Sequence, residues 1–70
     1  MAITLKAARV NKNLSQKEAA KLLKLSEYTL SNYERGISFP DVPVIKRIEE
    51  IYGLSYNDII FLSDDYGLTE

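Results

Sequence analysis

Polar side chains that could hydrogen-bond to the edges of DNA bases recur at helical spacing between residues 27 and 35. At about 100° per residue, one face of a helix over this range carries Glu27, Tyr28, Ser31, Asn32 and Arg35. Their carboxylate, phenol, hydroxyl, amide and guanidinium groups are the mixture of donors and acceptors that base-edge reading requires. The stripe lacks a Lys/Glu repeat, yet an ordinary solvated helix face would fit it equally well.

A helix start lies upstream of this stripe, at Ser15 and Glu18. The Ser15 hydroxyl can accept a hydrogen bond from the Glu18 amide, and the Glu18 carboxylate can accept one from the Ser15 amide. This capping-box pattern predicts a helix that runs to Leu23.

The stripe lies on a second helix whose two ends are marked in the sequence. Ser26 is a good N-cap and Gly36 a natural C-terminal stop, so we predict a helix over about 27–35. Lys24 and Leu25 form a tight turn between the two helices. Two short helices joined in this way, with the second more polar, have the helix-turn-helix layout, in which the second helix enters the major groove.

Further helices are predicted on both sides of this pair. Thr4 can cap a helix over about 5–12, which Asn13 can end because Asn tolerates the left-handed conformation. Asp41 can cap another helix that Gly53 ends, with a proline tolerated in its first turn.

A weaker capping box, Ser55 with Asp58, predicts a short fifth helix that ends near Phe61. Five helices with short connections give an all-α fold, a compact orthogonal bundle. We therefore expect a helix-turn-helix domain over residues 1–62 and a short acidic tail over 63–70.

Composition excludes several classes of protein. The 70-residue chain has neither Cys nor His, which excludes disulfides and argues against a zinc site and against most catalytic nucleophile–base pairs. Its acidic pairs, Glu49–Glu50 and Asp64–Asp65, are sequence neighbours rather than convergent groups. We expect no enzyme, no metal or other cofactor and no small-molecule ligand. Short apolar runs and early charges also argue against a membrane span or signal peptide, so we expect a cytoplasmic protein.

Charge is distributed unevenly along the chain. The net charge is −1, but residues 1–35 carry seven Lys or Arg against three Asp or Glu, a net +4. Residues 36–70 carry two against seven, a net −5. For a nucleic-acid binder the distribution matters more than the sum, although solvated helix faces would account for it as well.

The stretch SQKEAAKLLKLSEYTLSNYERG, residues 15–36, resembles the Cro/repressor-type (xenobiotic-response-element, XRE) helix-turn-helix family of phage and bacterial regulators. The resemblance covers roughly residues 4–61 and implies a lambda-repressor-like fold. Its matching positions are Leu14-Ser15-Gln16, Glu18, Ala19, Leu25-Ser26, Leu30-Ser31-Asn32-Tyr33-Glu34-Arg35-Gly36, Pro40, Val42, Ile45, Ile48, Tyr52-Gly53-Leu54-Ser55 and Asp58-Ile59-Ile60.

This resemblance implies roles for the polar positions. Base contacts would come from Glu27, Tyr28, Ser31 and Asn32. Phosphate contacts would come from Gln16, Lys17, Thr29 and Arg35. By its chemistry Asn32 could pair bidentately with adenine, and Glu27 could accept from cytosine. The resemblance also implies that Arg9 pairs with Glu34, which makes Arg9 a structural residue rather than a DNA contact.

Two positions depart from the family pattern. Lys24 stands where the family usually has Gly, and a left-handed Lys there would cost about 1 kcal/mol relative to Gly. We expect Lys24 to contact phosphate in exchange. Glu49 stands where the family tends to have a small apolar residue, so the helix that carries it is expected to pack or to be exposed differently.

The sequence therefore predicts specific binding to double-stranded DNA and transcriptional regulation, with repression as the expected outcome. The alternative is a protein-interaction module, such as an antitoxin or adaptor, on the same fold. A homodimer on a two-fold site is expected, because one such helix reads only a few base pairs. Apolar residues near the C-terminus are candidates for its interface, with Tyr52 and Ile60 expected rather in the core or scattered on the surface: Tyr52, Tyr56, Ile60, Phe61, Tyr66 and Leu68.

Overall fold

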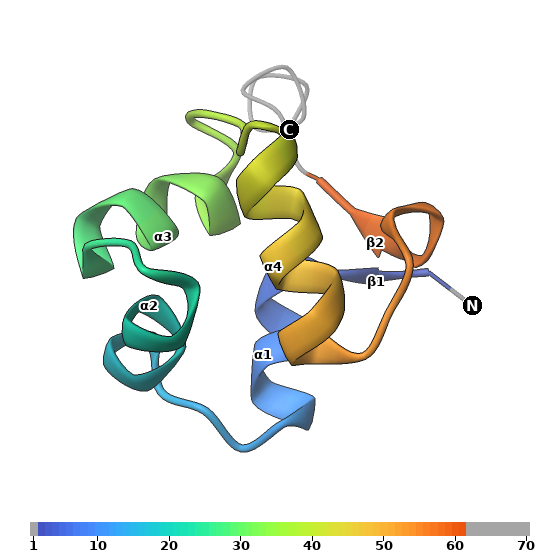
Figure 1. Cartoon of the computed structure of the whole chain (residues 1–70), viewed down its shortest axis with the longest axis horizontal. Coiled ribbons are helices and arrows are strands. Elements are labelled where there is room, and N and C mark those ends of the chain that lie inside the picture. The colour runs from blue at the N-terminus through green and yellow to red at the C-terminus, as the bar shows by residue number, and fades with distance from the viewer. Residues whose placement is uncertain (1, 62–70) are drawn as a thin grey trace, which may run out of the picture.

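Four α-helices, two very short strands and one 3-10 turn make up residues 2–61, the part of the chain that the computed structural model describes (Figure 1). The expected acidic tail, residues 63–70, lies outside the described residues. In chain order the elements are β1 (Ile3–Thr4), α1 (Leu5–Asn11), α2 (Gln16–Leu23), α3 (Glu27–Arg35), α4 (Val42–Tyr52), η1 (Tyr56–Asp58) and β2 (Ile59–Ile60).

Each α-helix begins directly after the residue predicted to cap it. The side chains of Thr4, Ser26 and Asp41 accept hydrogen bonds from the amides three residues ahead, at 3.1, 3.0 and 3.2 Å respectively. Ser15 and Glu18 form both hydrogen bonds of the capping box. These caps fix the first residue of each helix because they satisfy amides that no helical carbonyl can reach.

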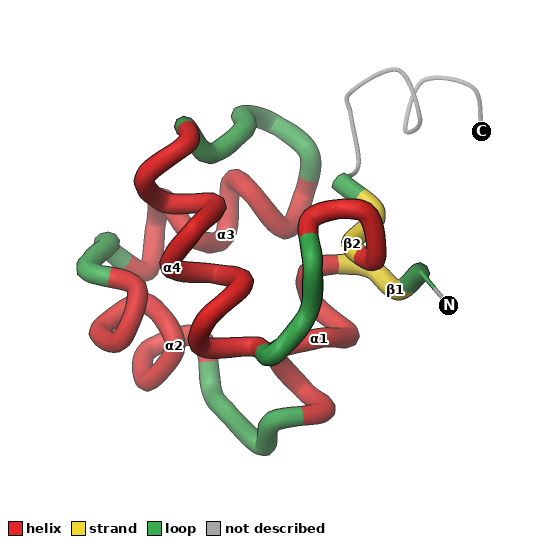
Figure 2. Tube along the Cα trace, turned by 45° about the vertical axis from the view of Figure 1, so that its right-hand side comes forward, coloured by secondary structure: helices red, strands yellow, loops and turns green. Residues whose placement is uncertain are grey.

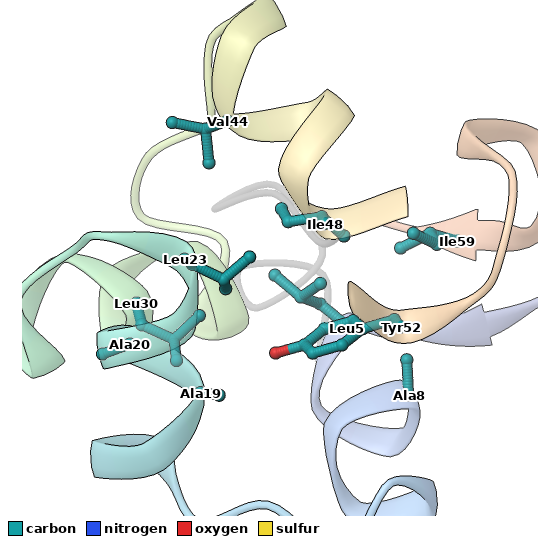
Figure 3. Packing of buried hydrophobic residues seen from close by; sticks show 10 residues of the cluster. All are labelled: Leu5, Ala8, Ala19, Ala20, Leu23, Leu30, Val44, Ile48, Tyr52 and Ile59. Carbon is teal, nitrogen blue, oxygen red and sulfur yellow. The ribbon is translucent and has the colours of Figure 1, made fainter. Parts of the chain in front are cut away.

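The helices pack around one apolar core, to which every helix contributes (Figure 3). Its largest fully buried side chains are Leu5, Leu23, Leu30 and Ile48, one from each α-helix. Ala19 and Ala20 are buried on α2, and their small side chains let α3 and α4 approach closely. In Figure 1, α2 and α3 lie on one side of α4, and the strands lie on the other. No helix within residues 2–61 is long and apolar enough to cross a membrane.

The predicted fifth helix is wrong, and with it the five-helix count. Ser55 makes no capping bond to a backbone amide; its hydroxyl donates to Asp58 at 3.0 Å, and a single 3-10 turn follows. The chain then becomes extended, and β2 pairs in parallel with β1, Ile3 opposite Ile59 (Figure 2). Two successive β-branched residues favour a strand, and five or six residues are too few for a stable helix.

Glu49, the departure on α4, holds this 3-10 turn in place. Its carboxylate accepts a hydrogen bond of 2.7 Å from the backbone amide of Tyr56. A small apolar residue at position 49 could not make this contact. The departure from the family pattern at position 49 therefore gives α4 a direct contact with η1.

Tyr52 brings a polar group into the core. The residue is 2% exposed, and its hydroxyl makes no hydrogen bond to the described residues. Burial raises the pKa of the Tyr52 phenol to about 12, with a further contribution from the nearby Glu34 carboxylate that Arg9 partly offsets. The phenolate is therefore disfavoured in the folded protein.

We expect this phenol to make the fold sensitive to alkali. Between pH 10 and about 12 the unfolded chain releases the Tyr52 proton and the folded chain retains it. The free energy of unfolding should therefore fall by up to about 1.4 kcal/mol per pH unit through this group. Urea unfolding of the wild type and Tyr52→Phe, at about pH 8 and about pH 11, measures it. Equal losses in the two proteins would contradict the assignment.

Candidate nucleic-acid interface

A buried ion pair ties α1 to α3. The guanidinium of Arg9 donates from Nε to Glu34 Oε2 at 2.7 Å and from a terminal nitrogen to Oε1 at 3.4 Å. The other terminal nitrogen donates to the carbonyl of Leu14 at 2.8 Å. Arg9 and Glu34 are only 8% and 7% exposed, so the pairing implied by the family resemblance is confirmed and is structural.

Glu34 also holds Gln16, the first residue of α2. The amide nitrogen of Gln16 donates to Glu34 Oε1 at 3.0 Å, which fixes the side chain over the start of the helix. An amide nitrogen has a second hydrogen that can still be donated to an acceptor. The first-turn amides of Gln16 and Lys17 have no intrahelical acceptor either, so donors concentrate at the positive end of α2.

The capping box at the same helix end keeps its negative charge. Hydrogen bonds from the Ser15 amide and, second, from the Ser15 hydroxyl hold the pKa of Glu18 below its ordinary value. The charged carboxylate is thereby committed to the cap, and the helix start remains well defined. Gln16 and Lys17 consequently begin α2 in a fixed orientation.

A shallow polar hollow of about 540 Å³ opens where α1, the start of α2 and α3 meet. We call it the cationic hollow, because exposed cations of two helices lie beside neutral donors. Its lining consists of Lys6, Arg9, Ser15, Gln16, Ser31, Glu34 and Arg35. Arg9 and Glu34 neutralise each other, so Lys6 and Arg35 leave the hollow with a net positive charge. Such a surface suits an anion with several acceptor oxygens.

Lys6 is the residue of this hollow that sequence analysis did not select. It lies three positions before Arg9 and therefore near the same face of α1. Once Arg9 is paired with Glu34, that spacing places Lys6 at the border between α1 and α3. The spacing of Lys6 and Arg9 places both on one face of α1, but only the ion pair between Arg9 and Glu34 shows that this face turns toward α3.

The outer stripe of α3 is accessible along its length. Glu27, Tyr28 and Arg35 are exposed, Tyr28 to 75%, and Ser31 and Asn32 are partly exposed. These side chains lie opposite Leu30, which is fully buried. The stripe is thus presented to the outside by a helix whose other face is anchored in the core.

Three of the five predicted phosphate contacts, Lys17, Lys24 and Thr29, do not line the cationic hollow. Lys17 is exposed in the first turn of α2. The Thr29 hydroxyl accepts a hydrogen bond of 2.9 Å from the Ser26 hydroxyl, within the N-cap of α3. Lys24 lies at the opposite end of α2 from Gln16, in the left-handed conformation at φ 61°. The structure therefore brings Gln16, Ser31 and Arg35 together, with Lys24 exposed at the interhelical turn.

Comparison with known proteins gives two matches. A helix-turn-helix family model matches residues 5–59. The chain is 39% identical over 51 residues to the HTH-type transcriptional regulator ImmR of Bacillus subtilis (strain 168). That alignment covers 73% of this chain but 40% of ImmR, so the chain spans well under half the length of this relative. No solved structure matches.

Removing Arg9 should cost far more stability than removing an exposed cation of the same helix. Arg9→Met leaves Glu34 buried without its counter-charge, which should lower the free energy of unfolding by about 3–5 kcal/mol. In the double variant Arg9→Met/Glu34→Met most of this loss should be recovered, because no lone charge remains.

Urea denaturation followed by circular dichroism measures these differences. Lys6→Met, on the same helix, is the matched control and should change stability by no more than about 0.5 kcal/mol. A double variant as unstable as Arg9→Met would show that the two charges do not depend on each other.

Proposed function

The chain belongs to the XRE-type helix-turn-helix family, and on this basis we propose that it binds a specific site in double-stranded DNA and regulates transcription, as a repressor. One observation carries the proposal: Ser31 and Arg35 belong both to the exposed stripe of α3 and to the cationic hollow. Groups suited to bases and groups suited to phosphates therefore form one continuous surface. A protein bound to a promoter through this surface would occlude it.

Four residues of α3 would read bases from within the major groove. Asn32 pairs bidentately with adenine, and Glu27 accepts from the amino group of cytosine. Tyr28, which is 75% exposed, contacts a thymine methyl group, and Ser31 hydrogen-bonds to a base edge. Glu27 also repels phosphate, which lowers affinity for any duplex that offers no cytosine at its position.

Backbone phosphates would be held on both sides of this reading surface. Gln16, Lys6 and Arg35 surround one phosphate in the cationic hollow, assisted by the first-turn amides of α2. Lys17 and Lys24 are exposed and supply further charge, Lys24 at the turn between α2 and α3. Thr29, whose hydroxyl can still donate while it accepts from Ser26, contributes a neutral contact. These contacts set the register in which α3 meets the bases.

The decisive test is binding of the purified protein to a duplex from the region upstream of its own gene, with a scrambled duplex for comparison. Specific binding should weaken steeply as salt rises, because each neutralised phosphate releases counterions. Asn32→Ala should lower specific affinity roughly tenfold and leave binding to the scrambled duplex unchanged. Asn57→Ala removes an exposed amide from η1 and should change neither.

Lys6→Ala provides the complementary result in the same assay. It should weaken binding to both duplexes equally and reduce the slope of log affinity against log salt by about 0.9, the value for one phosphate contact. Lys46→Ala, an exposed cation on α4, is its control. Folded wild-type protein that binds neither duplex would favour the protein-interaction alternative instead.

We also propose that the protein acts as a homodimer on a two-fold site. Of the candidate interface residues, Tyr52 is buried, Tyr56 and Ile60 are exposed, Phe61 is partly exposed, and Tyr66 and Leu68 lie outside the described residues. An apolar hollow of about 150 Å³ lies beside Tyr56. We call it the apolar patch; it is lined by Phe39, Pro40, Ile45, Tyr56 and Phe61. Two half-sites about one helical turn apart would give a site long enough to be selective.

Several features of the apolar patch support a second copy as its occupant. Phe39 is 58% and Tyr56 50% exposed, and the Tyr56 ring stacks on Phe61 with centroids 5.4 Å apart. Exposed aromatic rings beside a hollow are typical of association surfaces. The patch lies on the α3–α4 loop, α4 and the η1–β2 segment, so it leaves the stripe of α3 uncovered.

Phe39→Ser should weaken self-association and abolish cooperative filling of a palindromic duplex. Binding to an isolated half-site should change by no more than about twofold, since the reading surface is intact. Sedimentation equilibrium and titration of both duplexes measure the two effects. Val10→Ser removes an equally exposed apolar side chain from α1 and is the control. Unchanged cooperativity in Phe39→Ser would exclude the apolar patch as the dimer surface.

A further inference from the structure

Arg47 connects α4 to the turn between α2 and α3. Its Nε donates a hydrogen bond of 3.0 Å to the backbone carbonyl of Leu23, the last residue of α2. Among the side-chain hydrogen bonds of residues 2–61, this is the one that joins α4 to the helix-turn-helix pair. Arg47 is partly buried, and Leu23 is fully buried in the core.

The Leu23 carbonyl needs a partner from outside its own helix. The last carbonyls of a helix have no intrahelical donor, and a buried one without a partner is costly. The amides of Lys24 and Leu25 satisfy carbonyls further back, those of Ala20 and Lys21. Arg47 satisfies the carbonyl of Leu23 and also brings a positive charge to the negative end of α2.

This hydrogen bond acts on the peptide unit next to the strained residue of the turn. The Leu23 carbonyl and the Lys24 amide belong to one planar peptide. Arg47 holds its oxygen, and the carbonyls of Ala20 and Lys21 hold its N–H. Lys24 itself is left-handed at φ 61°, a conformation that is unfavourable for residues with a Cβ atom. The peptide is thus held from both sides where the backbone would otherwise relax.

We propose that Arg47 is a positioning residue for α3, and that it fixes the direction in which the stripe of α3 is presented to DNA. Three residues, Lys24–Ser26, join α2 to α3, so a rotation of the Leu23–Lys24 peptide is transmitted to the start of α3. The effect on DNA rests on the proposed function. The effect on the turn does not, and it can be measured without DNA.

The test compares Arg47→Met with Lys46→Met. Arg47→Met removes the guanidinium and keeps an unbranched apolar stem, and Lys46→Met removes the neighbouring exposed charge. Arg47→Met should lower specific affinity roughly tenfold, the equivalent of one lost base contact, while affinity for scrambled duplex changes less than about twofold. The slope of log affinity against log salt should stay unchanged, because no phosphate contact is removed. Lys46→Met should behave as the wild type.

The turn supplies a second, independent readout. Backbone amide chemical shifts of Lys24 to Tyr28 should move in Arg47→Met and stay in place in Lys46→Met. In a Lys24→Gly background, where the left-handed residue is unstrained, Arg47→Met should have a smaller effect on specific affinity. If Arg47→Met does not fold by circular dichroism, Arg47→Lys keeps the charge and stem and should give a smaller loss of the same kind.

Distinct results would overturn the proposal. Equal losses on both duplexes with a lower salt slope would make Arg47 a direct phosphate contact. Wild-type affinity, or amide shifts at Lys24 to Tyr28 that match those of Lys46→Met, would show that the hydrogen bond positions nothing. If the wild type binds no duplex, the proposed function fails, and the amide shifts alone decide the role of Arg47.

Discussion

A charge removed from water must have a partner, and this requirement determines how the first three helices meet. Arg9 and Glu34 are both buried and come from α1 and α3. Each is accommodated where the other lies, because a lone charge in so small a core would remove a large part of its stability. The guanidinium also binds the Leu14 carbonyl, and the carboxylate binds Gln16, so the α1–α2 connection and the start of α2 are drawn to the same point.

The same cluster relates stability to the proposed DNA surface. Gln16 is oriented by a residue of α3, and the hollow in front of it is lined by all three helices. The affinity for a phosphate bound there would therefore depend on the position of α3 relative to α2. The opposite end of α2 is held by Arg47 through the Leu23 carbonyl. Both ends of α2 are thus tied to neighbouring helices by side-chain hydrogen bonds, which suits a scaffold that must hold α3 at one angle.

Sequence patterns predicted the features that depend on local chemistry. The caps Thr4, Ser15, Ser26 and Asp41 begin helices as expected, and Asn13 is left-handed where the first helix was predicted to end. The segment that follows α4 was mispredicted as a fifth helix because the partner that makes it a strand is remote in sequence. Ile59 pairs with Ile3, 56 positions earlier, and a capping pattern at Ser55 carries no information about that contact. Lys6 and Arg47 escaped notice for the same reason, since their roles arise from helices that pack together only in the fold.

An overall charge of −1 is compatible with DNA binding because charge is distributed unevenly along the chain, with a net +4 over residues 1–35 and a net −5 over residues 36–70. The exposed cations of the first half include Lys6, Lys17, Lys24 and Arg35. On α4, by contrast, Lys46 and Arg47 are balanced by Glu49 and Glu50. A duplex would be attracted by the basic first half and repelled by the acidic second half, which favours one orientation of approach. A small net charge also means weak non-specific binding to DNA, because non-specific binding depends almost wholly on the neutralisation of phosphates. Selectivity is the ratio of specific to non-specific affinity, so a low non-specific affinity makes such a protein more selective. In the proposed complex Glu27 would act in the same direction, because its repulsion of phosphate would be offset only where a base offers a donor.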